Sequence, residues 1–253
     1  MIKIGSLFSG IGGFELGLER AIPGAETIWQ VEQNDFCQKV LSKHWPKAKI
    51  YNDVKNITAD KVEAVDILCG GFPCQDISTA GKGEGLHGKK SGLWWEMLRI
   101  ISELRPRIVI LENVAAILFR GGCEVVGSLT EIGYCTEWTI ISARDQGAPH
   151  LRRRWFAVAY PADSSMQRRK KYTERKRAME KTGKFERRSG KNKRSHDRNY
   201  WKGGPTESPL CRVDDGIPDR LDRLRSLGNA IVPQCSEWVG QQIVKSGLLQ
   251  ELS

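Results

Sequence analysis

The sequence lacks a long apolar stretch and lacks any paired cysteine pattern. No apolar run approaches the roughly 20 residues that a membrane-spanning helix needs, so we expect no membrane segment. Seven cysteines, an odd number without CxxC pairs or metal-ligand spacing, favour free thiols in a reducing cytoplasm over a disulfide framework or a metal site. The glycine-containing start over residues 4–14 has no convincing cleavage site, which predicts a part of the fold and not a signal peptide.

Net charge is almost absent outside one segment. Residues 163–204 hold 16 lysines and arginines against five acidic residues, whereas the remainder holds 24 against 25. A basic cluster attracts a polyanion because binding releases condensed counterions. Nucleic acid is therefore the predicted partner of this segment. The alternatives are an anionic membrane surface and a solubilising tail.

The length of 253 residues and an apolar content of 40% predict one large domain or a domain with a smaller appendage. The first 160 residues alternate short β-branched runs with amphipathic stretches, which is typical of α/β proteins with βαβ units around a parallel sheet. Helical spacing of apolar residues predicts a helix over 36–45 and another over 94–104, which Pro106 ends. Strands are predicted over residues 2–8, 27–32, 65–69, 107–111 and 155–159.

A glycine-rich turn joins the first predicted strand to a helix. Such a turn brings backbone close to a ligand, and an acid at the end of the next strand, Glu32, can bind ribose hydroxyls. The dinucleotide pattern GxGxxG fails at its last position, which is Glu15, so S-adenosylmethionine fits better than a nicotinamide cofactor. A tight turn without a ligand is the alternative. The turn and its flank read Phe8-Ser9-Gly10-Ile11-Gly12-Gly13.

Two chemically active side chains follow other predicted strands. Cys74 comes after the strand that contains Cys69, and Glu112 comes after the strand over 107–111. Open α/β sheets bind ligands at the carboxyl ends of their strands, so both side chains are expected at one site. A partly desolvated Glu112 would have a raised pKa suited to proton donation. The alternatives are a buried, inert cysteine, as we expect for Cys69, and a helix-capping glutamate.

Five motifs stand in the order found in cytosine-C5 DNA methyltransferases, and the chain resembles that family over about residues 1–160 and 214–245. The basic segment falls where the family carries its target-recognition domain. The sequence departs from the family at His150, where glutamine is usual, and at Ala230, where serine is frequent. The motifs are Phe8 to Gly13, Gly71-Phe72-Pro73-Cys74-Gln75, Glu112-Asn113-Val114, Gly147-Ala148-Pro149 with Arg152-Arg153-Arg154, and Leu227-Gly228-Asn229-Ala230.

The resemblance implies a Rossmann-like S-adenosylmethionine-dependent methyltransferase sheet with a small, basic target-recognition region. Residues 1–160 would form the catalytic and cofactor-binding domain, and 161–213 the recognition region. Residues 214–253 would pack back on the catalytic domain. In the cofactor site, Phe8, Gly10, Ile11, Gly12 and Gly13 would line the pocket, Glu32 would hold the ribose, Asp53 the adenine amino group, and Asn229 would border the site.

The resemblance also implies an activity and its catalytic residues. Cys74 would add to C6 of a flipped cytosine, Glu112 would act at N3, and Arg154, with Arg152 near it, would contact the base or support that contact. The product would be 5-methylcytosine in double-stranded DNA, made without a metal by a monomer in the cytoplasm of a bacterium or phage-infected host, as in restriction-modification systems. The alternatives are a tRNA cytosine-5 methyltransferase and a non-catalytic protein that binds nucleic acid.

Overall fold

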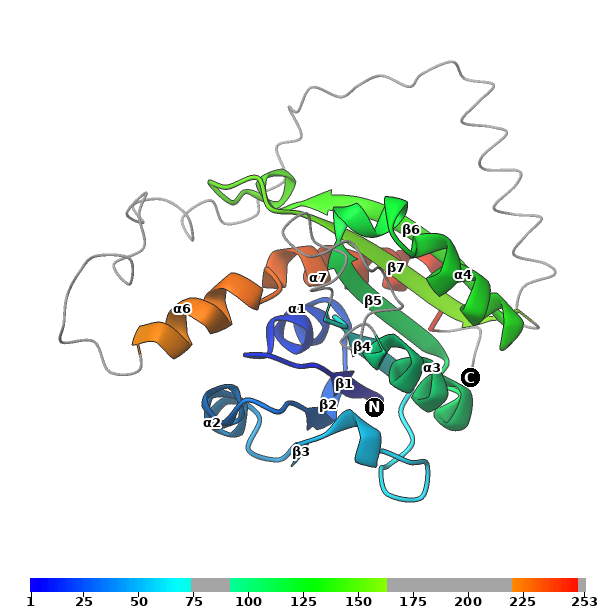
Figure 1. Ribbon diagram of the computed structural model, residues 1–253, viewed down its shortest axis with the longest axis horizontal. Coiled ribbons are helices and arrows are strands. Elements are labelled where there is room, and N and C mark those ends of the chain that lie inside the picture. Colours follow the sequence, from blue (N-terminus) through cyan, green and yellow to red (C-terminus); the bar gives the residue numbers. More distant parts are fainter. Residues whose placement is uncertain (74–91, 163–219, 250–253) are drawn as a thin grey trace, which may run out of the picture.

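The computed structural model describes residues 1–73, 92–162 and 220–249 (Figure 1). Cys74, the glycine-rich loop after it and the basic segment lie outside the described residues. Among those described, no helix is both long and apolar enough to cross a membrane. The five cysteines described, residues 37, 69, 123, 135 and 235, are free thiols.

Strands and helices alternate along the chain, as the sequence predicts for an α/β protein. A seven-stranded sheet has the order β3-β2-β1-β4-β5-β7-β6, so the strand order reverses between β1 and β4. The elements are β1 (Ile2–Leu7), α1 (Gly13–Ala21), β2 (Ala25–Val31), α2 (Asp35–His44), β3 (Lys49–Tyr51), η1 (Val54–Asn56), β4 (Ile67–Gly70), α3 (Leu93–Leu104), β5 (Ile108–Val114), η3 (Ala115–Phe119), α4 (Gly122–Glu131), β6 (Tyr134–Ser142), η4 (Ala143–Gln146), β7 (Arg153–Pro161), α6 (Arg220–Asn229) and α7 (Pro233–Ser246).

The sheet is mixed, whereas the sequence pattern predicts a parallel one. β1 to β5 pair in parallel, but β7 runs antiparallel to both β5 and β6. The connection between β6 and β7 contains only the short η4 and a few further residues, which is too short for a parallel crossover. The prediction missed both edge strands, β3 and β6. β3 has only three residues, and β6 is partly exposed along its length.

The predicted boundary of β5 is wrong in a way that matters for the site. The strand continues past Leu111 to Val114, so Glu112 lies inside the strand and not after it. The extension exists because β7 supplies a pairing partner, with Glu112 opposite Phe156 and Val114 opposite Arg154. Cross-strand pairing therefore fixes the backbone that carries Glu112.

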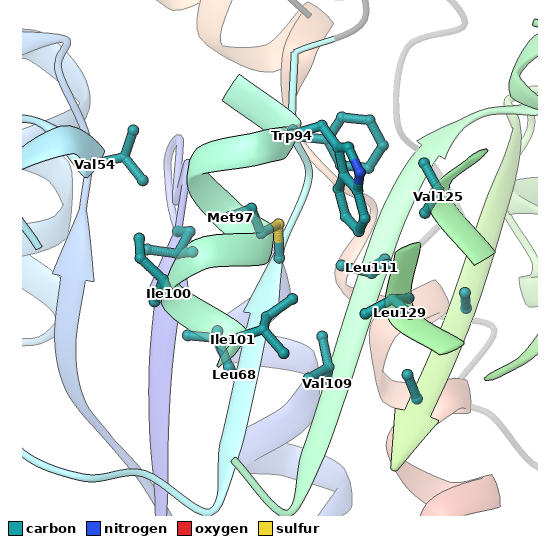
Figure 2. Close-up of a cluster of buried hydrophobic side chains, with 14 of the residues drawn as sticks. Val54, Leu68, Trp94, Met97, Ile100, Ile101, Val109, Leu111, Val125 and Leu129 are labelled. Atoms are coloured by element: carbon teal, nitrogen blue, oxygen red, sulfur yellow. The ribbon is translucent and has the colours of Figure 1, made fainter. Parts of the chain in front are cut away.

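Helices cover both faces of the sheet and bury two hydrophobic clusters. Alternate residues of β5 point to opposite faces: Val109 and Leu111 contact the cluster under α3 and α4, and Ile108 and Ile110 contact the cluster under α1 and α7. Figure 2 shows α3 lying over β4 and β5, with Trp94 and Met97 of α3 and Leu129 of α4 among the side chains of this cluster. Full burial of a side chain of this size contributes about 1.5–3 kcal/mol.

The segment after α6 packs closely against the glycine-rich turn. A Cβ at Gly13 would lie 2.3 Å from the backbone oxygen of Ile231, and the hydroxyl of Ser236 donates to the Gly13 carbonyl over 2.9 Å. In α7, a Cβ at Gly240 would lie only 2.6 Å from the Cβ of Ala21 in α1. The absence of a side chain at Gly13 thus lets the C-terminal segment approach α1.

We predict that Gly13→Ala lowers the free energy of unfolding by about 1–3 kcal/mol, because the added methyl group must displace the Ile231 backbone. Gly127→Ala is the matched control, because Gly127 lies in α4 and no atom lies within 4 Å of its Cβ position. This change should raise the free energy of unfolding by roughly 0.5–1 kcal/mol, since alanine is favoured over glycine inside a helix. Urea denaturation of both variants checks this. Equal effects of the two substitutions would contradict the close packing at Gly13.

A carboxyl group is buried beneath the turn. Glu15, in the first turn of α1, is fully buried, and its Oε1 accepts a hydrogen bond of 3.1 Å from Gln30 of β2. Burial raises the pKa of Glu15, and the hydrogen bonds it accepts, including those from Ser6 and Gln30, counteract this only in part. Burial and then the nearby Glu15 raise the pKa of Cys69 well above its ordinary value, in agreement with an inert thiol.

We predict that Glu15→Gln makes the protein more stable at about pH 8 and leaves it nearly unchanged at about pH 4. Because the folded-state pKa is raised, the proton on Glu15 stabilises the fold below the ordinary pKa of 4.5, and this stabilisation is lost as the pH rises through the folded-state value. Between the ordinary pKa and the folded-state pKa, the wild-type free energy of unfolding falls by about 1.4 kcal/mol per pH unit because of this one group. Denaturant titrations across this pH range measure the difference.

Glutamine keeps the shape of the side chain and cannot ionise. The control is Glu131→Gln, which removes an exposed carboxyl from α4 and should produce no such pH-dependent gain. A gain in stability for Glu15→Gln that is the same at every pH would show that folding does not raise the pKa of Glu15.

Candidate functional site

A cavity of about 520 Å³ opens at the carboxyl edge of the parallel strands. Its walls come from the residues after β1, β2 and β4, from the end of β5, from Arg154 in β7 and from the end of α6. It includes the point where the strand order reverses between β1 and β4, which is where open α/β sheets bind ligands. Side chains that are far apart in the sequence therefore meet in one pocket.

The glycine-rich turn and Glu32 form one side of this cavity. The Glu32 carboxylate accepts backbone hydrogen bonds of 2.8 Å from Gly10 and 2.8 Å from Asn34. Phe8 has φ 57°, a left-handed conformation that is uncommon for a residue with a side chain and that marks a constrained backbone. Phe8, Gly10 and Glu32, which the sequence analysis assigns to the cofactor site, all line the cavity.

Other predicted cofactor residues are not among the residues that line the cavity. Gly12 has φ 87°, and a Cβ there would lie 2.2 Å from the Trp45 ring. Gly12 and Gly13 thus serve the packing of the turn, and they and Ile11 are not part of the lining. The Asp53 carboxylate accepts a hydrogen bond of 3.0 Å from the Lys55 backbone at the start of η1, and the adjacent Val54 is the one that lines the cavity.

Glu112 and Arg154 form an ion pair on the opposite side of the cavity. The Arg154 Nε lies 3.0 Å from Oε1 of Glu112, and the side chains are 23% and 12% exposed. Gly71 makes room for the carboxylate, because a Cβ at Gly71 would lie 2.8 Å from Oε2 of Glu112. The antiparallel pairing of β5 with β7 brings these two side chains together from different parts of the chain.

The Glu112 carboxyl has an unusual proton affinity. Burial raises the pKa of Glu112 to about 7, against the opposing effect of Arg154 and, more weakly, of Arg152. Desolvation therefore outweighs the attraction of two guanidinium groups. A carboxyl with a pKa near 7 can both hold and release a proton at neutral pH, which suits a general acid or base.

Arg152 is turned towards a different partner. Its guanidinium donates to the carbonyl of Gly228 over 2.9 Å and to that of Ala230 over 2.7 Å. Burial lowers the pKa of Arg152, as does Arg154 to a smaller extent, while Glu112 opposes the shift. The predicted pair of arginines is thus divided in the structure: Arg154 contacts Glu112, and Arg152 contacts the C-terminal backbone.

The structure adds cavity residues that the sequence analysis did not single out. Asn34 caps α2 by accepting a hydrogen bond of 2.9 Å from the Cys37 backbone, and the thiol of Cys37 lies 3.3 Å from the hydroxyl of Ser226. Asn34, Cys37 and Ser226 all line the cavity beside the predicted Asn229. Asn34 could have been predicted from the sequence, because it is a polar residue two positions after Glu32. Cys37 and Ser226 are brought together only by the tertiary fold.

The predicted nucleophile itself, Cys74, lies outside the described residues. The two residues before it, Phe72 and Pro73, line the cavity, and the Asn113 side-chain amide donates to the Phe72 carbonyl over 3.3 Å. The described part of the chain before Cys74 thus ends at the cavity wall, where Gly71 lies next to Glu112.

Comparison with known proteins gives close matches. The chain is 38% identical over 160 residues to the type II methyltransferase M.CviJI of Paramecium bursaria Chlorella virus IL3A, covering 62% of this chain and 42% of that protein. It is 32% identical over 165 residues to the type II methyltransferase M.HhaI of Haemophilus parahaemolyticus, covering 64% and 50%. The chain therefore spans about half the length of the curated relatives it matches.

Solved structures and a family model agree with these matches. The S. pombe Dnmt2 methyltransferase superposes with a TM-score of 0.55 at 21% identity, covering 64% of this chain and 51% of that one. The Entamoeba histolytica methyltransferase EhMeth gives a TM-score of 0.56 at 22% identity, covering 63% and 53%, so both show a shared fold. The model of C-5 cytosine-specific DNA methylases matches residues 2–217, and the chain belongs to this family.

Proposed function

We propose that this protein transfers a methyl group from S-adenosylmethionine to C5 of a flipped cytosine in double-stranded DNA. The observation that carries the proposal is the pairing of Glu112 with Arg154 in the same cavity as Glu32 and the Gly10 turn. One side of the cavity has the acceptor expected for ribose hydroxyls, and the other has a carboxyl with a pKa of about 7. Membership of the cytosine-C5 methylase family supports the same reaction.

The cavity fits S-adenosylmethionine in size and in chemistry. Its volume of about 520 Å³ is within the roughly 300–1,000 Å³ of typical small-molecule sites. Each Glu32 oxygen accepts one backbone hydrogen bond and keeps a further lone pair for a hydroxyl. Apolar side chains such as Phe8, Val54 and Leu93 provide surfaces for an adenine ring. When bound, the cofactor supplies a methyl group on a sulfonium, which is an electrophile.

The residues of the chain make the cytosine able to accept that methyl group. The Cys74 thiolate adds to C6, while Glu112 shares its proton with N3 and so accommodates the electron pair displaced into the ring. Arg154 holds the Glu112 carboxyl in place. After C5 has accepted the methyl group, a base removes the C5 proton, the bond between sulfur and C6 breaks, and the thiolate leaves.

The DNA substrate is proposed on two grounds. The family acts on cytosine in DNA, and the segment over 163–204 carries a large excess of lysine and arginine. C5 of a stacked cytosine is out of reach inside a duplex, so the base has to be extruded at a cost of a few kcal/mol. A basic recognition segment would offset part of that cost through phosphate contacts.

We predict that the rate of methyl transfer, plotted against pH, has a descending limb that reports the ionisation of Glu112. With a pKa of about 7, Glu112 loses its proton as the pH rises, so the wild-type rate should fall above about pH 7. Glu112→Gln should lower the rate about 100-fold or more and abolish this limb, because an amide donates weakly and cannot ionise. Single-turnover rates measured over a pH series test this. An unchanged limb in the variant would assign it to another group.

We predict that Cys74→Ala abolishes methyl transfer to a cytosine-containing DNA duplex and leaves cofactor binding within about twofold of wild type. The loss follows because alanine cannot add to C6. The assay measures transfer of labelled methyl groups to duplex DNA and, in parallel, to tRNA, with cofactor binding measured by calorimetry. Cys123→Ala is the matched control, since Cys123 is an exposed free thiol of α4 and should not affect the rate.

The parallel substrates separate the alternatives. Transfer to tRNA alone would end the DNA assignment, and near wild-type transfer by Cys74→Ala would end the covalent mechanism. If the wild-type protein binds the cofactor but transfers no methyl group to either polymer, a non-catalytic nucleic-acid-binding protein is favoured.

A further inference from the structure

We propose that Arg152 is a positioning residue for the cofactor: its guanidinium holds the Gly228–Ala230 backbone as a wall of the cavity and does not contact the target base. The inference rests on the proposed function in taking S-adenosylmethionine as the ligand of this cavity. It gives the two arginines of the Arg152-Arg153-Arg154 run separate tasks, one at the cofactor wall and one at Glu112.

The contact has the geometry of a fork that grips two acceptors. Nη1 donates to the Gly228 carbonyl over 2.9 Å, and Nη2 donates to the Ala230 carbonyl over 2.7 Å. A guanidinium is planar and presents its donors in a fixed arrangement, so it can satisfy two carbonyls of one turn at once. These bonds link residues 76 and 78 positions apart, and they join the start of β7 to the end of α6.

The backbone that carries Arg152 is itself held. The Arg152 carbonyl accepts a hydrogen bond of 3.1 Å from the backbone of Ala143, and the preceding Leu151 carbonyl accepts one of 2.7 Å from the Ser142 hydroxyl. Both donors lie where β6 passes into η4. Arg152 therefore extends from a fixed anchor on the sheet to the C-terminal segment.

The other end of the same segment is anchored on the glycine-rich turn. Ile231 packs against Gly13, and Ser236 donates to the Gly13 carbonyl over 2.9 Å. Gly228 and Asn229, which belong to the part held by Arg152, line the cavity. Their own side chains are exposed or absent, so backbone contacts such as those of Arg152 are what the structure offers to fix their position.

Direct contact between Arg152 and a base is disfavoured by where its donors point. Each terminal nitrogen of the guanidinium donates to one of the two carbonyls, and the Nε is buried without a hydrogen-bond partner among the described residues. Arg152 is also absent from the cavity lining, whereas Arg154 is part of it. Loss of Arg152 should thus loosen the cofactor wall before it affects the base.

The test compares Arg152→Ala and Arg152→Lys with wild type in the whole 253-residue chain. Amide hydrogen exchange without ligand should become faster in residues 226–232 of Arg152→Ala. The Kd for S-adenosylmethionine, measured without DNA, should rise about tenfold or more, as expected for the loss of hydrogen bonds from a charged donor. Arg152→Lys should lie between the two, because a single ammonium cannot grip both carbonyls in a planar fork.

Arg105→Ala is the matched control, because Arg105 also donates to a backbone carbonyl, that of Ile132, and it packs over Tyr134 away from the cavity. It should leave exchange in residues 226–232 and the Kd for S-adenosylmethionine unchanged. In turnover with DNA, the KM for S-adenosylmethionine should rise in Arg152→Lys while kcat stays within about threefold.

Unchanged exchange in residues 226–232, or a lowered kcat with unchanged cofactor affinity, would overturn the positioning role. If Arg152→Ala fails to fold, the exchange and affinity of Arg152→Lys decide the question. If the wild-type protein does not bind S-adenosylmethionine, the proposed function fails, while the exchange data still determine whether Arg152 holds the segment.

Discussion

The antiparallel pairing of β7 with β5 is the constraint on which the site depends. β5 is a buried central strand, and β7 sets Arg154 opposite Val114 and within an ion-pair distance of Glu112. Because the pairing is antiparallel, the start of β7 lies at the edge where the parallel strands end. Without it, Glu112 would be a buried carboxylate with no adjacent cation, an arrangement that costs several kcal/mol.

The same pairing explains the proton affinity of Glu112. The carboxyl is only 12% exposed, so burial favours its neutral form, while Arg154 favours the charged form. The balance places its pKa at about 7. Glu15 shows what burial does without a nearby arginine: its pKa is raised, and its known partners are hydrogen-bonding groups. Burial thus raises the pKa of both glutamates, but Glu112 is paired with an arginine and Glu15 with hydrogen-bonding groups.

The C-terminal segment completes the cavity through contacts that are mostly made by backbone. Gly13 accepts close approach from Ile231, Ser236 binds the Gly13 carbonyl, and Arg152 binds two carbonyls on the other side. The end of α6 is thus held between the glycine-rich turn and the start of β7. A glycine in a cofactor-like turn can consequently serve packing, as Gly12 and Gly13 do, while its neighbour Gly10 faces the cavity.

The sequence by itself determined the α/β class, the main central strands and the position of Phe8, Gly10 and Glu32 at the carboxyl ends of the first two strands. These follow from local patterns, since alternating apolar runs, a glycine-rich turn and an acid near a strand end are visible in short windows. Only the tertiary structure decided the antiparallel course of β7, the extension of β5 to Val114, the burial that raises the pKa of Glu112 and the separate partners of Arg152 and Arg154. Each of these depends on a hydrogen bond or a pairing between segments far apart in the chain, and such a contact leaves no periodic signal in the residues that make it.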